Sequence, residues 1–321
     1  MNSTYPGVRP GHGEPLPDLR SAVELAQQCA WRAHQQGTFC VGGVLLGPNL
    51  QLLAESSNHV LWQGGCDPTA HGERQLVDWY FDQPQMPAAD QCTVVSTLDP
   101  CMMCAGALLY GGFRVLSLAL DLQAGVNCAG DFQFKTLPPA LRGQARERFA
   151  YFGVEGVRPP FGCDQLVPAS FERESFSLFE QSMQKVQARI HSRRGRIPAP
   201  TQWRGESAAL LDESGQAVAV AGDGPHTRTA IMELARHQAL KDLTLVQRVG
   251  PDLGPLSIME MGAYGSCLEG PLPPSSRAAW QYLRPGCPAA DLSAQLRRMP
   301  PHYRELVGIR IEPAGSPASP L

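Results

Sequence analysis

Two short motifs in this sequence hold residue types that bind metal ions. His71 and Glu73 stand two positions apart in DPTAHGER, and Cys101 and Cys104 stand three apart in LDPCMMCAG. Zinc takes imidazole and thiolate ligands in tetrahedral sites, and a catalytic site supplies three protein ligands and leaves one position for water. His71, Cys101 and Cys104 would supply three, so the pattern predicts a zinc site with one open position.

Glu73 distinguishes a catalytic zinc site from a structural one. A structural site would use four closed ligands and has no need of a neighbouring acid. A carboxylate two residues from a ligand can instead take a proton from the water at the metal, whose pKa zinc lowers to about 7. The alternatives are a redox cysteine pair or a structural site that recruits Cys92 or Cys128, and neither uses Glu73.

The cysteine pair is expected at the start of a helix. Cys101 and Cys104 are i and i+3, so both sulfurs lie on one face of the first turn, and Pro100 is tolerated just before it. The partial positive charge at a helix N-terminus favours thiolates.

The histidine motif is expected to begin a second helix, at about 70–83. His71 and Glu73 lie in its first residues. Gly72 between them leaves room for another group to approach the backbone.

The sequence around the motifs alternates between helical and strand patterns. Asp18 is a plausible N-cap for a helix that ends at Gly37. Strand-turn-strand, helix, strand, helix and strand patterns follow, at 39–56, 70–83, 93–98, 100–112 and 114–121. This alternation favours a sheet with helices packed on it.

Length and composition narrow the class of protein. The chain has 321 residues, enough for about two domains, and its net charge of −3 disfavours a sequence-independent nucleic-acid binder. No apolar run approaches ~18 residues, so we expect no membrane partner. The 10 cysteines are scattered, and no secretory segment is visible, so we expect thiols or ligands in the cytoplasm.

Composition shifts suggest four parts. We expect a flexible arm at 1–17, a catalytic domain at 18–192, a basic and Pro-rich linker at 193–202 and a C-terminal domain at 203–321.

The C-terminal domain contains a faint repeat of the first. Thr229-Ala230-x-x-Glu233 echoes Thr69-Ala70-x-x-Glu73, and LLDESGQAVAV corresponds to the earlier LLGPNLQLLAE. The match is either a diverged internal duplicate or chance. If it is a duplicate, it is a non-catalytic one, because the second copy has no zinc-ligand set.

Residues 20–135 resemble the cytidine deaminase superfamily, within it the branch of bacterial tRNA adenosine deaminases and guanine deaminases. The resemblance rests on VGGVLL at 41–46, Asn58, DPTAHGE at 67–73 and STLDPCMMCAGAL at 96–108. H-x-E…P-C-x-x-C is the pattern of zinc nucleobase deaminases, in which the Glu transfers protons and is not a ligand. Gly72 is a departure, because the family usually has Ala there.

The resemblance implies a fold and a set of contacts. The implied fold is a three-layer α/β/α arrangement with a mixed five-stranded sheet, as a homodimer or as a monomer with an internal pseudo-dimer. Asn58 would hydrogen-bond the base, and the backbone around Cys101, with Pro100 and Gly72, would help to bind the ring and the reacting water. Glu73 would pass protons to the substrate and to leaving ammonia.

Three classes of substrate remain open. A tRNA adenosine deaminase fits TLDPCMMCAGAL, but it lacks support from the charge unless the basic stretch at 184–196 contacts RNA. A guanine-like base fits the charge, and Asp131 in NCAGDFQF would contact that base, unless it is only a solvated loop acid. A specialised heterocycle is the third class. We favour a small heterocycle in purine or specialised metabolism over RNA. A non-catalytic scaffold or regulator is the alternative of another kind.

Overall fold

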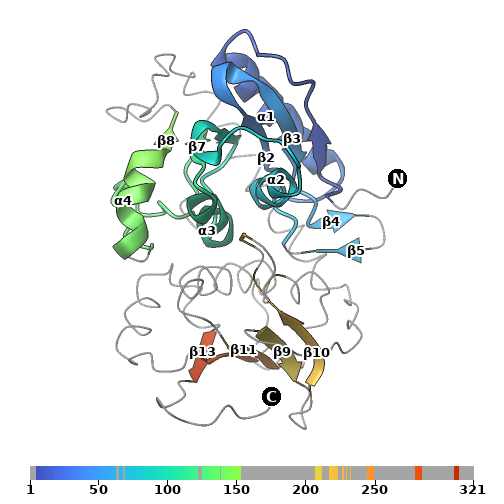
Figure 1. The fold of residues 1–321 in the computed structure, drawn as a ribbon, viewed down its shortest axis with the longest axis vertical. Coiled ribbons are helices and arrows are strands. Elements are labelled where there is room, and N and C mark those ends of the chain that lie inside the picture. The colour runs from blue at the N-terminus through green and yellow to red at the C-terminus, as the bar shows by residue number, and fades with distance from the viewer. Residues whose placement is uncertain are drawn as a thin grey trace.

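The computed structural model describes two large β-sheets (Figure 1). The residues described are 5–62, 65–67, 69–121, 125–137, 139–152, 207–211, 217–222, 226–227, 229, 232, 244–248, 279–283 and 307–310. The basic stretch at 184–196 and the linker at 193–202 lie outside this part of the chain. The expected domain boundaries therefore stay predictions.

The first sheet has six strands between Val8 and Tyr151. They are β1 (Val8–Pro10), β2 (Gly42–Leu46), β3 (Leu52–Ser57), β6 (Thr93–Ser96), β7 (Arg114–Ser117) and β8 (Phe149–Tyr151). Their order is β1-β3-β2-β6-β7-β8. Pairs from β1 to β6 are antiparallel, and pairs from β6 to β8 are parallel, so the sheet is mixed, as expected.

Helices cover both faces of this sheet (Figure 1). On one face lies α1 (Leu19–Gln35), and on the other lie α2 (Gly72–Phe81) and α3 (Met102–Gly111), with α4 (Pro139–Arg148) beside α3. Consecutive strand residues alternate between the two faces. Val94 accordingly belongs to the core under α2 and α3, and Val95 belongs to the core under α1.

Two glycines in β2 allow the helices to approach closely. A Cβ at Gly42 would lie 2.2 Å from the backbone nitrogen of Ala30 in α1. A Cβ at Gly43 would lie 2.9 Å from the Val95 carbonyl and 3.7 Å from Leu76 Cδ1 of α2. Any larger residue at Gly42 would push α1 off the sheet.

The first helix has the cap that the sequence predicts. The Asp18 carboxylate accepts hydrogen bonds from the backbone nitrogen and the hydroxyl of Ser21, both at 2.8 Å. Leu19, Val23, Ala26 and Ala30 are buried, as the helical periodicity requires. Gly37 follows the helix with φ 73°, a conformation that glycine adopts without strain.

The expectation of five strands is wrong, because the N-terminal arm adds a sixth. Residues 8–10 of the arm, expected to be flexible, pair with β3 as β1. The Gly7 nitrogen also donates to Gln75 Oε1 of α2 at 3.0 Å, and the Tyr5 hydroxyl donates to Asp82. Three backbone pairings and these polar contacts hold a Pro- and Gly-rich segment that has no strand pattern of its own.

Short elements complete the first half. A small antiparallel hairpin of β4 (Leu61–Trp62) and β5 (Gly65–Cys66) precedes α2. Two 3-10 turns, η1 (Pro48–Leu50) and η2 (Ala89–Gln91), precede β3 and β6.

A second large sheet lies in the C-terminal part of the chain. Its strands are β9 (Ser207–Leu211), β10 (Ala217–Gly222), β11 (Thr244–Arg248), β12 (Ala279–Leu283) and β13 (Val307–Arg310). β9 and β10 form the strand-turn-strand unit that the sequence predicts. Within the described ranges, no helix is both long and apolar enough to cross a membrane.

Candidate metal centre and active site

The start of α2 holds the histidine and the glutamate. His71 is the N-cap residue, with extended backbone angles, and its carbonyl accepts from the Gln75 nitrogen at 3.0 Å. The segment before it is held near the end of β3 by the His59 nitrogen, which donates to the Ala70 carbonyl at 2.8 Å. Glu73 therefore lies in the first turn of the helix, next to the unpaired N–H groups.

The start of α3 holds the two cysteines. Cys101 is the N-cap residue, and its carbonyl accepts from the Ala105 nitrogen at 2.8 Å. Cys104 lies in the first turn. Because α2 and α3 pack side by side, the first turns of both helices carry their functional residues to one place.

The structure brings the three expected ligands together. The ligand atoms of His71, Cys101 and Cys104 all lie within 4.8 Å of one another, and Cys101 Sγ is 3.6 Å from His71 Nδ1. Two thiols and one imidazole form a donor set that suits zinc, and three protein ligands leave a fourth position for water or substrate. His71 and Cys101 are only half-buried, so the site can be reached from outside.

The thiols of Cys101 and Cys104 have pKa values shifted in opposite directions. The pKa of the Cys101 thiol lies well below its usual value, chiefly because the Cys104 thiol donates a hydrogen bond to it, with His71 adding to the effect. Burial raises the pKa of Cys104 well above its usual value. One thiolate is thus ready to bind a cation, and metal binding must displace the second proton.

Glu73 is buried beside these ligands. Its side chain is 3% exposed, and Oε1 accepts a hydrogen bond from Ser96 Oγ at 2.6 Å. Burial raises its pKa, although the Ser96 hydrogen bond and the charge of His71 act in the opposite direction. A buried carboxyl group with a raised pKa is suited to acid–base catalysis.

Asn58 follows β3 and is also buried. Its Oδ1 accepts from Thr38 Oγ1 at 2.7 Å and from the Val60 nitrogen at 3.1 Å. These two donors fix the orientation of the amide, because an oxygen must face them. The NH₂ end is then the end that can donate to a ring.

Gly72 has a close neighbour on β3. A Cβ built at Gly72 would lie 2.9 Å from Ser56 Oγ. Ser56 is fully buried, and in the described part of the chain its hydroxyl has no hydrogen-bond partner. The room that Gly72 leaves is therefore taken by Ser56, which gives a physical reason for glycine where the family usually has alanine.

This pair leads to a stability prediction. Gly72→Ala alone should be nearly neutral, because the gain in helix propensity of ~1 kcal/mol is offset by displacement of Ser56. In a Ser56→Ala background, the same change should raise the free energy of unfolding by ~0.5–1 kcal/mol. A double-mutant cycle by urea unfolding measures the coupling. Equal effects of Gly72→Ala in both backgrounds would contradict the contact.

Pro100 and Asp99 shape the loop before Cys101. The Pro100 carbonyl accepts from the Val126 nitrogen at 3.0 Å. The Asp99 carboxyl accepts from the Asn127 nitrogen at 2.8 Å and from the Tyr151 hydroxyl at 2.6 Å. Burial raises the pKa of Asp99 to about 8. Asp99 therefore ties the cysteine loop to the 125–130 turn and to β8.

Asp131 has its own polar partners in the 131–135 loop. Its carboxylate forms an ion pair with Lys135 Nζ at 2.6 Å and accepts from the Gln133 nitrogen at 3.0 Å. The hydrogen bond from Lys135 is the main reason that its pKa is lowered. Contact between Asp131 and a substrate base stays a prediction. Phe134, in the same loop, is buried in the hydrophobic core.

Sequence reasoning missed three residues that position the site. Ser96 orients Glu73, Thr38 orients Asn58, and Asp99 fixes the cysteine loop. Ser96 and Asp99 lie inside the quoted STLDPCMMCAGAL segment, so their closeness to Cys101 was a usable signal. Thr38 contacts Asn58 across 20 positions, and nothing local marks it.

The comparison with protein families agrees with this geometry. Residues 17–118 match the family model described as the cytidine and deoxycytidylate deaminase zinc-binding region. His71, Glu73, Cys101, Cys104 and Asn58 all lie within the match. The match covers less than half of the chain, and it includes His71, Cys101 and Cys104, which together could hold a zinc ion.

Relatives match only part of their own length. A tRNA(Ile)-lysidine synthase of Thermus thermophilus is 33% identical over 134 residues, which are 42% of this chain and 24% of that protein. A tRNA-specific adenosine deaminase of Haemophilus influenzae is 33% identical over 108 residues, which are 33% of this chain and 59% of that protein. The chain thus spans less than two thirds of each of these relatives.

A guanine deaminase structure from Nitrosomonas europaea is also similar. The two sequences are 15% identical, and the match covers 53% of this chain and 86% of the guanine deaminase chain, with a TM-score of 0.36.

Proposed function

We propose that this protein is a zinc-dependent aminohydrolase that removes an amino group from a nucleobase, a nucleoside or a related heterocycle. The observation that supports this most strongly is the buried Glu73 carboxylate beside the His71, Cys101 and Cys104 cluster. A structural zinc site has no use for an acid with a raised pKa at this place.

Each residue has a chemical task in this reaction. A zinc ion held by His71, Cys101 and Cys104 would supply a Lewis acid that lowers the pKa of a water molecule to about 7. Glu73 accepts the proton of that water, donates it to the ring nitrogen, and then transfers a second proton to the departing amino group. The carbon exchanges its C–N bond for a C–O bond, so substrate and water yield a carbonyl product and ammonia.

Ser96 and Asn58 prepare the site for this chemistry. The Ser96 hydroxyl holds Glu73 Oε1 and leaves Oε2 for proton transfer. Asn58, at 1% exposure, can donate from its amide nitrogen to an acceptor on the ring. Hydrogen bonds from buried donors discriminate strongly, because an unpaired partner costs ~1–3 kcal/mol.

We favour a guanine-like base or another small heterocycle as the substrate. The net charge of −3 supports this choice over a polynucleotide. A tRNA adenosine deaminase is the second candidate, favoured by the 33% identity to the Haemophilus influenzae enzyme.

An ammonia-release screen separates these candidates. Zinc-loaded protein is incubated with guanine, adenine, cytosine, their nucleosides, pterins and a tRNA anticodon stem-loop. Release from a small molecule supports the favoured class, and release from the RNA alone supports the second candidate. If the zinc-loaded protein released ammonia from none of these compounds, the result would contradict the proposed activity on them.

Asn58 provides a further prediction. Asn58→Ala should lower kcat/KM by ~10–100-fold at unchanged zinc content, because the ring loses a buried donor. Thr38→Val leaves the amide in place but removes one of its two anchors, so its effect should be smaller. Steady-state kinetics with zinc analysis measures both variants. Wild-type kcat/KM in Asn58→Ala would rule out its role in substrate binding.

A further inference from the structure

The two large sheets share one topology. In chain order, β2, β3, β6, β7 and β8 form five strands with the spatial order second, first, third, fourth, fifth. The strands β9, β10, β11, β12 and β13 have the same spatial order. In both sheets the first strand is antiparallel to its two neighbours, and the last three strands are parallel.

The sequence repeat agrees with this topology. The hairpin β9–β10 matches β2–β3, and Thr229-Ala230 follows its hairpin in the sequence as Thr69-Ala70 follows the earlier one. Two independent features, strand order and sequence position, thus equate the same parts of the two halves. Chance similarity of five residues would not also reproduce the order and direction of five strands.

The second half lacks the metal ligands. Ile231 stands where the first half has His71. Residues 249–278, between β11 and β12, contain no histidine and a single cysteine, Cys267, where the first half has Cys101 and Cys104. This half therefore cannot form the same three-ligand site.

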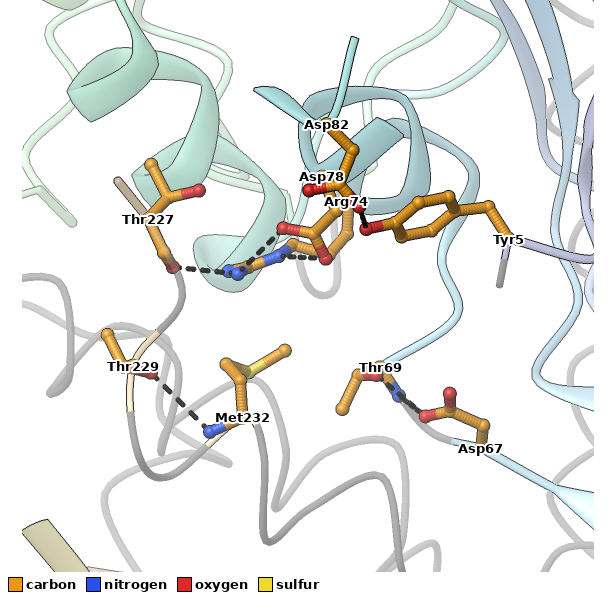
Figure 2. Close-up of polar contacts among 9 residues, drawn as sticks. All are labelled: Tyr5, Asp67, Thr69, Arg74, Asp78, Asp82, Thr227, Thr229 and Met232. Carbon is orange, nitrogen blue, oxygen red and sulfur yellow. Dashed lines mark hydrogen bonds and ion pairs between the residues drawn. The ribbon is translucent and has the colours of Figure 1, made fainter. Parts of the chain in front are cut away.

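Residues of the second half contact α2 of the first half (Figure 2). Arg74 donates to the Thr227 carbonyl at 2.7 Å, and it also forms an ion pair with Asp78 at 3.2 Å. Met232 is 1% exposed and belongs to the core cluster that contains Leu76 of α2.

An aromatic contact continues this interface along α2. The Phe81 and His226 rings stack with centroids 4.3 Å apart and planes 9° apart. In Figure 2 the turn of Thr229 and Met232 lies opposite the loop of Asp67 and Thr69. His226, Thr227 and Met232 of the second half thus join α2 of the first half at one interface. Two halves of like topology that meet at one interface are arranged like two subunits of a dimer.

We infer that the second sheet belongs to a deaminase-fold unit without metal ligands, which docks on α2 in the place of a second subunit. Its residues His226, Thr227 and Met232 contact the helix that carries Glu73 and follows His71. Arg74 is a positioning residue in this arrangement, because its guanidinium ties the first turn of α2 to the Thr227 carbonyl. The inference concerns the chain's architecture and holds whichever substrate the first half takes.

Amide hydrogen exchange on the full zinc-loaded chain tests this inference without using activity. Met232→Asp places a charge in the α2 contact, so the amides of α2 should exchange at least ~10-fold faster than in the wild type. α1, which packs on the opposite face of the sheet, is the internal control and should change less than about twofold. Met232→Ala should give the same pattern with a smaller α2 effect, and it covers the case in which Met232→Asp does not fold.

Two results would overturn the inference. One is unchanged α2 protection in Met232→Ala, or equal acceleration of exchange in α1 and α2. The other is a wild-type protein that sediments with the mass of two chains, together with unchanged α2 protection in Met232→Asp. We expect instead a mass near the 34.8 kDa of one chain.

Discussion

Glu73→Gln should reduce kcat by about 10²- to 10⁴-fold and leave zinc binding unchanged. Glutamine has the same shape and can still accept the Ser96 hydrogen bond through its oxygen, but it cannot take up and release a proton. Zinc content, by mass spectrometry or colorimetric chelation, and steady-state ammonia release measure the two quantities on one sample.

A matched control separates the loss of the acid from the loss of a charge. Glu24→Gln makes the same chemical change at an exposed position of α1, and its activity should equal that of the wild type. Ser96→Ala should lie between the two, because Glu73 stays present but loses its anchor. Substantial turnover by Glu73→Gln at full zinc content would refute the assigned role of this residue.

Cys104→Ser should abolish zinc binding and lower the stability of the fold. Serine is a poor zinc ligand, and a site with two remaining protein ligands holds the metal weakly. A ligand present at about 1,000 times its Kd stabilises a fold by about 4 kcal/mol, so the loss of zinc should produce a decrease of about this size. Thermal unfolding with and without zinc, together with metal analysis after dialysis, measures both effects.

Cys92→Ser is the matched control for this prediction. Cys92 is fully buried, like Cys104, but it lies outside the metal cluster. It should retain zinc and show a similar change in stability with or without added metal. Full zinc content in Cys104→Ser would mean that the metal, if bound, uses other ligands.

The candidate metal ligands were predictable because each is positioned by residues close to it in the sequence. His71 and Cys101 are each fixed at the start of a helix by backbone geometry that a few neighbouring residues determine. The order of the helices and strands then brings the two helix starts together. α1 was predictable for the same reason, since Asp18 and the apolar periodicity lie within one segment.

The sixth strand and the long-range contacts that hold the candidate site were not predictable from local patterns. β1 pairs with the distant strand β3, Arg9 opposite Glu55, and its three residues carry no alternation of polar and apolar character. The contact between Arg74 and Thr227 spans 153 positions, so its cause lies in tertiary packing. Asp131 forms an ion pair with Lys135, and its expected contact with a substrate base stays a prediction.

The measurement that tests the central claim most directly is the yield of ammonia per substrate consumed by the zinc-loaded chain. We predict one ammonia for each molecule converted, with a product that carries a carbonyl oxygen in place of the amino group and with turnover abolished in Glu73→Gln. Conversion of a substrate without ammonia, or ammonia release that persists in Glu73→Gln, would contradict the account.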